Sequence, residues 1–191
     1  MNTLHKKHSE PFYYCYYWRS PEPISTHKSL PTGYKISLWR PNGTQLVPRG
    51  LPIWPFVIWR LFHFLRIFSN LDYSMILIYQ DEKLVHRSVV FPGFFRFPFM
   101  ERTDLQIGDT WTHPEHRGKG LAKFALAVAV NHFHSPNRGF WYIVEEKNVP
   151  SIKVVESVGF QMVGRCKKVP RFGSLFLGYY QCELNLTQKE E

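Results

Sequence analysis

The sequence predicts a single α/β domain, because extended and helical patterns alternate along its 191 residues. An extended run from 105 to 112 leads through a short loop to an apolar segment from 121 to 134, which has the length of a helix. A run of aromatic and β-branched residues from 140 to 144 follows and is typical of a strand. A chain of this length can bury a substantial core, so one domain is sufficient.

The first part of the chain has a less regular pattern. Residues 1–33 are rich in Tyr, Pro, Ser and His, and they include an aromatic cluster from 12 to 18. The prolines that follow the cluster argue against regular structure, so we expect an N-terminal arm packed over a domain that runs from 34 to 186. Alternatively, the aromatic side chains line a substrate pocket. Residues 187–191 should form a polar tail.

Other segments show the alternation or the β-branched content of strands. The strands expected from these patterns are 34–40, 73–79, 83–91, 161–169 and 174–184. The second and third of these should form a hairpin. An aromatic loop from 92 to 100 either contacts substrate or fills the core.

The segment from 51 to 68 is apolar for most of its length yet contains Arg60, His63 and Arg66. It is too short and too charged to span a bilayer. One interpretation is a helix largely buried in the domain, with its arginines reaching water. The other is an interfacial helix that makes peripheral membrane contact, or a wall for a hydrophobic acceptor.

The charge and the cysteine content limit which binding partners and which cellular compartment we expect. The formal net charge of +9 could serve nucleic acid, an anionic membrane face or an anionic ligand. Nucleic acid is not expected, since the basic residues are scattered and no nucleic-acid-binding motif is present. The three cysteines, Cys15, Cys166 and Cys182, cannot all pair, and no secretory signal is visible, so a cytoplasmic location is expected. Neither the cysteines nor the histidines have metal-ligand spacing, so we expect no metal site.

The loop before the long helix has the composition of a phosphate-binding turn. Gly118 and Gly120 let the main chain approach a diphosphate, and the free N–H groups at the helix start favour an anion. Two known phosphate loops do not fit. The nucleoside-triphosphatase loop needs Ser or Thr where Leu121 stands, and the dinucleotide fingerprint needs a third glycine where Lys123 stands.

What remains, PEHRGKGLA from 114 to 122, resembles the acyl-CoA pyrophosphate loop of the GNAT superfamily of N-acyltransferases. A second block, Val144-x-x-x-Asn148-x-x-Ser151 followed by Gly159-Phe160, looks like the second GNAT signature. The two blocks occur in the family's order, and the resemblance covers roughly residues 72 to 185.

The resemblance implies a mixed, mostly antiparallel central sheet with helices on both faces. It also implies acetyl-CoA or another acyl-CoA as co-substrate, and direct acyl transfer to an amine. The strand before the loop would pair with pantetheine, the loop would bind pyrophosphate, and the second block would support the pantetheine arm. The cofactor-binding residues expected on this basis are Thr110, Trp111, Thr112, His116, Arg117, Gly118, Lys119, Gly120, Leu121, Ala122, Asn148 and Ser151.

The usual proton-handling residues of the family are replaced here. The position of the frequent acidic Tyr is Val155, and the position of a frequent carboxylate is Ile143. Acyl transfer to an amine still needs a proton acceptor and a donor for the thiolate. The replacement candidates are Asp109, His86, Glu145 and Tyr142. Each of them could instead be a structural polar group, with His86 and Asp109 paired across the strands.

The acceptor is not defined by the sequence. Aromatic residues and the basic apolar segment suggest an amino sugar or a sugar-lipid precursor of polysaccharide biosynthesis. A small amine, an amino acid or a peptide N-terminus is the alternative, and a homodimer is compatible with the sequence. A non-catalytic acyl-CoA-binding or membrane-associated relative is the alternative of another class.

Overall fold

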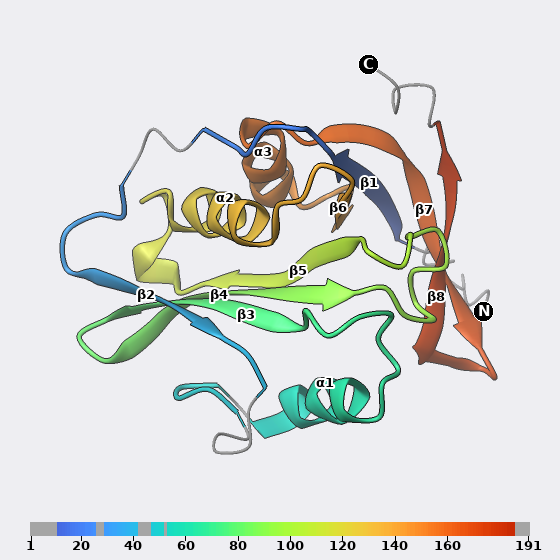
Figure 1. Ribbon diagram of the computed structural model, residues 1–191, viewed down its shortest axis with the longest axis horizontal. Helices are drawn as coiled ribbons and strands as arrows, with labels where there is room; N and C mark the ends of the chain where they lie inside the picture. Colours follow the sequence, from blue (N-terminus) through green and yellow to red (C-terminus); the bar gives the residue numbers. More distant parts are fainter. Residues whose placement is uncertain (1–10, 26–28, 42–46, 52, 186–191) are drawn as a thin grey trace, which may run out of the picture.

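Figure 1 shows a computed structural model of the chain, which describes residues 11–25, 29–41, 47–51 and 53–185. The strands are β1 (Phe12–Trp18), β2 (Tyr34–Trp39), β3 (Ser74–Gln80), β4 (Lys83–Pro92), β5 (Leu105–Thr112), β6 (Phe140–Glu145), β7 (Gln161–Arg171) and β8 (Ser174–Leu184). The helices are α1 (Ile53–Phe64), α2 (Leu121–Phe133) and α3 (Val149–Ser157), with a short 3₁₀ turn, η1 (Pro114–His116). Strands expected from the sequence end within two residues of the observed bounds.

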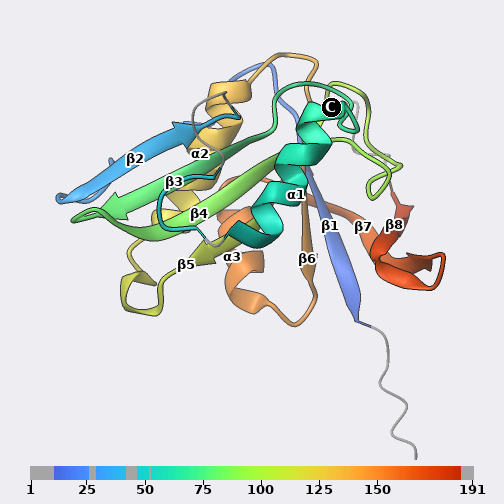
Figure 2. The same ribbon diagram turned by 90° about the horizontal axis from the view of Figure 1, so that it is seen from below.

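The eight strands form one sheet in the order β2-β3-β4-β5-β6-β1-β7-β8. Every neighbouring pair is antiparallel except β5 and β6, which are parallel. Helices α2 and α3 cover one face of the sheet and α1 lies across the other, as Figures 1 and 2 show. The expected α/β class, with helices on both faces of a mostly antiparallel sheet, is therefore confirmed.

Strand β1 lies inside the sheet, between β6 and β7, and pairs with both (Figure 1). The expectation of an arm laid over the domain is wrong for these residues. Tyr16 and Trp18 belong to the core beneath α2 and α3, while Tyr17 packs on the opposite face. Because both faces are buried, both sets of side chains are apolar and no alternation is visible in the sequence. The buried aromatic side chains thus fill the core, and Trp18 also lines a cavity beside α2 and α3.

Helix α1 is held to the sheet by an aromatic cluster. Phe56 and Trp59 on the helix pack with Phe91 of β4 and with Phe94 and Phe97 of the loop that follows. Ring centroids of Trp59 and Phe91 are 5.2 Å apart, in the edge-to-face arrangement that aromatic pairs prefer. The loop expected to contact substrate or fill the core therefore places these two phenylalanines in the core.

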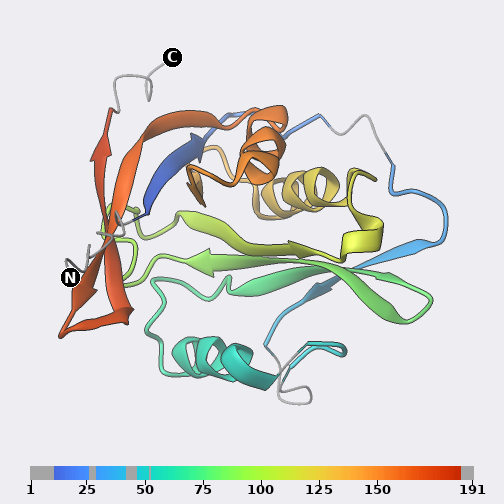
Figure 3. The same ribbon diagram turned by 180° about the vertical axis from the view of Figure 1, so that it is seen from behind.

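The cysteines behave differently from expectation. Cys166 and Cys182 are opposite one another on β7 and β8 and form a disulfide, and Cys15 is buried with a free thiol. The β7–β8 hairpin stands at the edge of the sheet in Figure 3. The argument from cysteine content for a reducing compartment loses its support, since disulfides persist in oxidising environments. Among the described residues, none of the helices has both the length and the apolar character needed to cross a membrane.

Candidate functional site

Strands β5 and β6 pair only at their beginnings and then separate. The register records two pairs, Leu105 with Phe140 and Gln106 with Trp141. Asp104 closes this end of the gap, because its carboxylate accepts hydrogen bonds from the amide of Gly139 at 2.9 Å and from the indole of Trp141 at 2.7 Å. Beyond these pairs, the edge of β5 that faces β6 has no strand partner among the described residues. Its main-chain groups are therefore available to a ligand.

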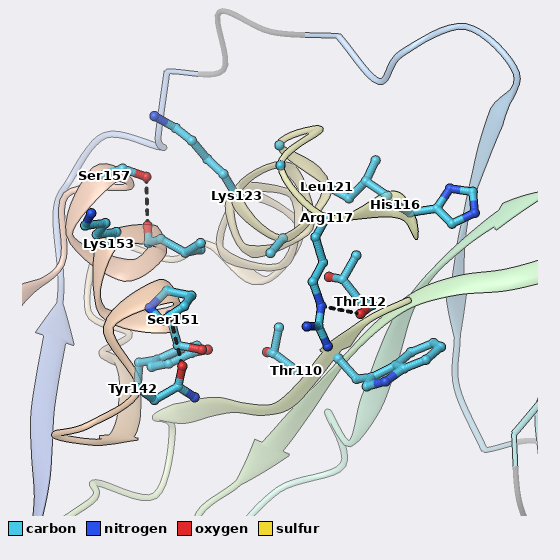
Figure 4. A pocket seen from close by; sticks show the side chains of 17 residues that line it. Thr110, Thr112, His116, Arg117, Leu121, Lys123, Tyr142, Ser151, Lys153 and Ser157 are labelled. Carbon is cyan, nitrogen blue, oxygen red and sulfur yellow. Dashed lines mark hydrogen bonds between the residues drawn. The ribbon is translucent and has the colours of Figure 1, made fainter. Parts of the chain in front are cut away.

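A cavity of about 550 Å³ lies where the strands separate, beside α3 and at the N-terminus of α2 (Figure 4). All of the residues expected to bind cofactor line this cavity, with the exception of Lys119. Lys119 instead extends to the hydroxyl of Tyr34 at 3.2 Å and lies in the wall of a second cavity of about 850 Å³. Side chains that the sequence did not single out also contribute, among them Lys123 and Lys153.

The N-terminus of α2 opens on this cavity without a side-chain cap in the part of the chain that the structure describes. Its cap residue, Gly120, has φ 79°, and Gly118 in the preceding turn has φ 75°, conformations that L side chains adopt only with strain. The first main-chain bond of the helix runs from the amide of Phe124 to the carbonyl of Gly120 at 3.0 Å. The three preceding amides and the helix dipole therefore favour an anion at this end of the cavity.

Basic side chains surround the helix N-terminus. Arg117 lies in the cavity and donates from Nε to the carbonyl of Thr112 at 3.2 Å, which Figure 4 shows. Lys123 on α2 and Lys153 on α3 line the same space. The two lysines come from different helices that meet only in the fold, so the loop motif could not indicate them. The arrangement suits a ligand with several phosphate charges.

Asn148 and Ser151 have a structural role in addition to lining the cavity. The side chain of Asn148 caps α3 by accepting from the amide of Ser151 at 3.3 Å. The cap fixes the start of α3 beside the end of β6. Val155, in the place of the family's frequent Tyr, is fully buried in the core.

A bulge decides which side chains of β5 reach the cavity. The β4–β5 register shifts between Arg87 and Val89, and Asp109 has φ 43°. Strict alternation would place Asp109 on the same face as Ile107, which belongs to the core under α2. The bulge instead turns Thr110 toward the cavity and Asp109 to the opposite face.

The expected pairing of His86 with Asp109 is wrong for this reason. Asp109 accepts two hydrogen bonds from Arg87, at 3.0 and 3.3 Å, and the guanidinium of Arg87 lies over the ring of Phe56 from α1. Glu145 is exposed at the end of β6, paired in register with Tyr13, and does not line the cavity. Neither carboxylate faces the cavity.

His86 and Tyr142 lie on the cavity side of the sheet. His86 is fully buried, with Nδ1 2.8 Å from the hydroxyl of Thr112 and Nε2 3.0 Å from the hydroxyl of Ser88. Burial, and secondarily the charge of Arg87, lowers the pKa of His86 to about 4, so the imidazole is neutral. Tyr142 lines the cavity, and burial raises the pKa of its phenol, while the nearby hydroxyls of Thr110 and Ser151 oppose that shift.

Among the residues that the structure describes, two groups of side chains bring three metal-ligating atoms within 4.8 Å of one another. One is the set of cysteines, two of which are joined as a disulfide. The other is His113, Glu115 and His116, in the turn before α2. The sequence does not indicate the second group, because its members are local to one turn and lack a recognised ligand spacing.

The separated strands and the uncapped helix leave a cavity whose position and charge suit an extended phosphorylated ligand. A model of the acetyltransferase (GNAT) family matches residues 51–160, so the chain belongs to the GNAT family. Members of this family are acyltransferases that use acetyl-CoA. No curated protein matches the chain by sequence.

Solved structures with the same fold are distant in sequence. A tandem GNAT protein from the clavulanic acid biosynthesis pathway is 18% identical with a TM-score of 0.55, over 82% of this chain and 51% of its own. A GNAT-family acetyltransferase from Novosphingobium aromaticivorans is 14% identical with a TM-score of 0.51, over 82% and 61%. A Drosophila protein is 12% identical with a TM-score of 0.54, over 81% and 48%. The chain thus spans about half to three fifths of the length of these proteins.

Proposed function

We propose that the chain is an N-acyltransferase that moves an acyl group from acetyl-CoA, or another acyl-CoA, to an amine. The observation that carries this proposal is the continuity of one cavity. It joins the uncapped N-terminus of α2, with its basic neighbours, to the free edge of β5 and the phenol of Tyr142. An acyl-CoA has the matching sequence of groups: a diphosphate, an amide-containing arm and a thioester.

In this proposal the diphosphate accepts hydrogen bonds from the first amides of α2 and lies near Lys123 and Arg117. The amides of the pantetheine arm pair with the unpartnered edge of β5, between Thr110 and Thr112. Asn148 and Ser151 border the arm on the other side. This order brings the thioester toward the gap between β5 and β6.

The chemistry requires two proton transfers. The amine nitrogen attacks the thioester carbonyl carbon, a C–N bond forms, the C–S bond breaks, and the sulfur leaves with the electron pair. Tyr142 lines the cavity and is proposed to protonate the sulfur. Asp109 and Glu145 lie on the opposite face, on the two strands that border the gap, and are the candidates for accepting the proton of the amine.

Release of free CoA thiol from acetyl-CoA tests the activity. Amino sugars, as suggested by the sequence, come first in the acceptor panel, followed by small amines, amino acids and peptide N-termini. Amine-dependent thiol release that is lost in Tyr142→Phe would support the enzyme. Calorimetric binding of CoA without thiol release for any acceptor would favour the non-catalytic relative, which the replacement of the usual Tyr by Val155 motivates.

A second proposed property is peripheral contact with an anionic membrane through α1 and the residues after it. This α1 surface exposes large apolar side chains, with Phe64 81% and Trp54 68% accessible. The other exposed apolar residues of this surface are Leu61, Leu65, Ile67 and Leu71. Arg60 and Arg66 lie among them. Burial is the main cause that lowers the pKa of His63, and the charges of Arg60 and Arg66 lower this pKa further, which indicates a positive local potential.

The charge pattern favours lipid over a second copy of the chain. A two-fold dimer formed through this surface would bring two copies of Arg60 and Arg66 into one interface. An anionic lipid surface would instead accept the apolar side chains and neutralise the arginines. A cytoplasmic, membrane-peripheral location is compatible with this proposal.

A further inference from the structure

Three side chains with metal-ligating atoms converge in the turn between β5 and α2. They are His113, which precedes η1, and Glu115 and His116, which lie within it. Each side chain offers one atom, a ring nitrogen or a carboxylate oxygen, such that all three atoms lie within 4.8 Å of one another. Two imidazoles and one carboxylate are a ligand set that Zn²⁺ uses in proteins, with a further position left open.

The two imidazole rings have the spacing of rings that share one ion. The centroids of His113 and His116 are 5.5 Å apart, with an interplanar angle of 72°. Two imidazoles on one tetrahedral zinc ion, each with a Zn–N distance of about 2.0–2.1 Å, have centroids about 5 Å apart. Small rotations of the two side chains are therefore sufficient for both rings to bind the same ion.

One nitrogen of His113 has no hydrogen-bond partner among the residues that the structure describes. This nitrogen, Nδ1, is buried although 42% of the side-chain surface is exposed. Buried polar atoms normally have a partner, which can be a protein atom, a water molecule or an ion. The distance from Nδ1 to Oε2 of Glu115 is 4.0 Å, which is too long for a hydrogen bond. An ion between the two atoms would be a partner for both.

His116 has the second contact that is usual for a metal-bound histidine. Its Nδ1 lies 2.9 Å from the hydroxyl of Tyr34 on β2, and Lys119 Nζ donates to the same hydroxyl at 3.2 Å. A metal-bound imidazole commonly hydrogen-bonds through its other nitrogen, and this bond fixes the tautomer and the orientation of the ring. With Nδ1 paired to Tyr34, Nε2 is the nitrogen left for an ion. In Figure 4 the ring of His116 extends away from the centre of the cavity.

The main chain orders the three ligands before any ion binds. The amide of His113 donates to the carbonyl of Val85 on β4 at 2.9 Å, and the amide of His116 donates to the carbonyl of His113 at 2.9 Å. Pro114, the first residue of η1, has a fixed φ that restricts the turn further. Ligands that are already ordered lose less entropy on binding. The carboxylate of Glu115 is 82% exposed and can rotate to complete the site.

We propose that His113, Glu115 and His116 form a binding site for Zn²⁺ or a chemically similar divalent transition-metal ion, with Tyr34 as the outer partner of His116. The expectation of no metal site rests on sequence spacing, which does not account for ligands that a 3₁₀ turn holds together. The site is independent of the proposed acyltransferase activity. A bound ion would stiffen the turn that leads from β5 to Arg117 and α2.

Calorimetric titration of the metal-free protein with Zn²⁺ tests the site. The wild type should bind one ion in this turn with a Kd of about 1 µM or lower. Glu115→Gln should bind at least tenfold more weakly, and because Glu115 is exposed, the substitution removes a ligand without disturbing the fold. Tyr34→Phe, which removes only the outer partner, should weaken binding by about tenfold. Equal affinities of the wild type and Glu115→Gln would overturn the proposal.

A control at the end of α2 distinguishes this site from binding by histidines in general. His132→Gln with His134→Gln removes as many imidazoles as His113→Gln with His116→Gln. His132 and His134 belong to neither group of metal-ligating side chains in the described part of the chain, and Nε2 of His132 lies 3.1 Å from a nitrogen of Arg40. The control should bind Zn²⁺ as the wild type does, whereas the other double variant should lose the tight binding. Equal losses in the two double variants would overturn the proposal.

Substitution by Co²⁺ gives a spectroscopic result that does not depend on activity. The wild type should show the visible absorption of Co²⁺ in a site of low coordination number, and Zn²⁺ should abolish this absorption by displacing the Co²⁺. Mg²⁺ should have no effect, because it requires oxygen ligands in octahedral geometry. The absorption should be absent from His113→Gln with His116→Gln. An unchanged Co²⁺ spectrum in that variant would overturn the proposal, even if the protein transfers acyl groups.

Discussion

Asp104 and Trp141 hold the closed end of the gap between β5 and β6, through a hydrogen bond of 2.7 Å from the indole nitrogen to the carboxylate. Asp104 is 1% exposed and also accepts from the amides of Gly139 and Glu101. Burial raises the pKa of the Asp104 carboxyl, and these three hydrogen bonds oppose the shift. The pair therefore holds the two strands together at the end where they are neighbours.

Asp104→Asn should lower the free energy of unfolding by about 2 kcal/mol, because the new amide group would face N–H donors. Urea unfolding monitored by tryptophan fluorescence measures this change. Asp72→Asn is the control, since Asp72 forms an ion pair with Arg138 nearer the surface and should cost less than about 1 kcal/mol. Equal losses in the two variants would contradict the assigned role of Asp104.

Gly118→Leu should weaken CoA binding at least a hundredfold while the protein remains folded. An added Cβ meets no atom within 4 Å, so the substitution costs only the strain of a positive φ, about 1–2 kcal/mol, but places a side chain in the cavity. Calorimetric titration with CoA measures the affinity. Gly173→Leu is matched in φ and in open space, lies in the turn between β7 and β8, and should bind CoA normally. Undiminished binding by Gly118→Leu would refute the placement of the diphosphate.

The buried imidazole of His86 should make the fold sensitive to acid. Its pKa is lowered to about 4 in the folded protein from an ordinary 6.5, so the unfolded chain takes up the proton first as the pH falls. The associated stability is complete above pH 6.5 and is lost as the pH falls toward 4, by roughly 3 kcal/mol. Unfolding free energies measured from pH 7.5 to 4 should show this loss, and His86→Gln should show a correspondingly flatter dependence. Parallel curves for the two proteins would exclude His86 as the cause.

The Cys166–Cys182 disulfide should contribute about 3 kcal/mol, because it closes a loop with a sequence separation of 16. Reduction, or Cys166→Ser, should lower the melting temperature. The Cys15→Ala variant keeps the disulfide, so its melting temperature should also fall on reduction. A melting temperature that does not change on reduction would show that the pair is absent. Titration of thiols in the denatured, unreduced protein should give one free thiol. Three free thiols would show that the pair does not form under those conditions.

The α1 surface should bind anionic vesicles. Flotation with phosphatidylglycerol-containing liposomes should recover the protein, and Arg60→Glu with Arg66→Glu should reduce recovery about tenfold or more. The control combines Lys35→Glu on β2 with Lys167→Glu on β7. It changes the net charge by the same amount as the arginine variant, and it should have a smaller effect on recovery. Phe64→Ser separates the apolar contribution from the electrostatic one. Equal recovery of the two charge-reversed proteins would point to net charge alone and remove α1 from the interaction.

The turn before α2 and most strands could be predicted because their signals are local. Two glycines at positive φ and an apolar helix after an extended run have few structural alternatives. Strand β1 could not be recognised in the same way, since burial on both faces removes the alternation that marks a half-buried strand. The disulfide depends on the pairing of β7 with β8, which a spacing of cysteines alone does not define.

The side chains around the gap between β5 and β6 are the hardest part of the site to predict. A one-residue bulge at Asp109 reverses which side chains of β5 face the cavity, and no feature of the sequence marks it. Strict alternation favoured Asp109 as the partner of His86, whereas the fold gives that place to Thr112 and Ser88. Tyr142 could be proposed because β6 is regular up to its end.

The position of β1 has a consequence for how the molecule is assembled. In the described part of the chain, β7 and β8 join the rest of the sheet through β1, so these two strands dock on one that lies far earlier in the sequence. Such distant contacts slow folding, because a long loop must close before they form. A chain shortened to begin at residue 34 would therefore lack the strand on which the β7–β8 hairpin docks. Strand β6, which forms one wall of the gap, would then be left with an open, aggregation-prone edge.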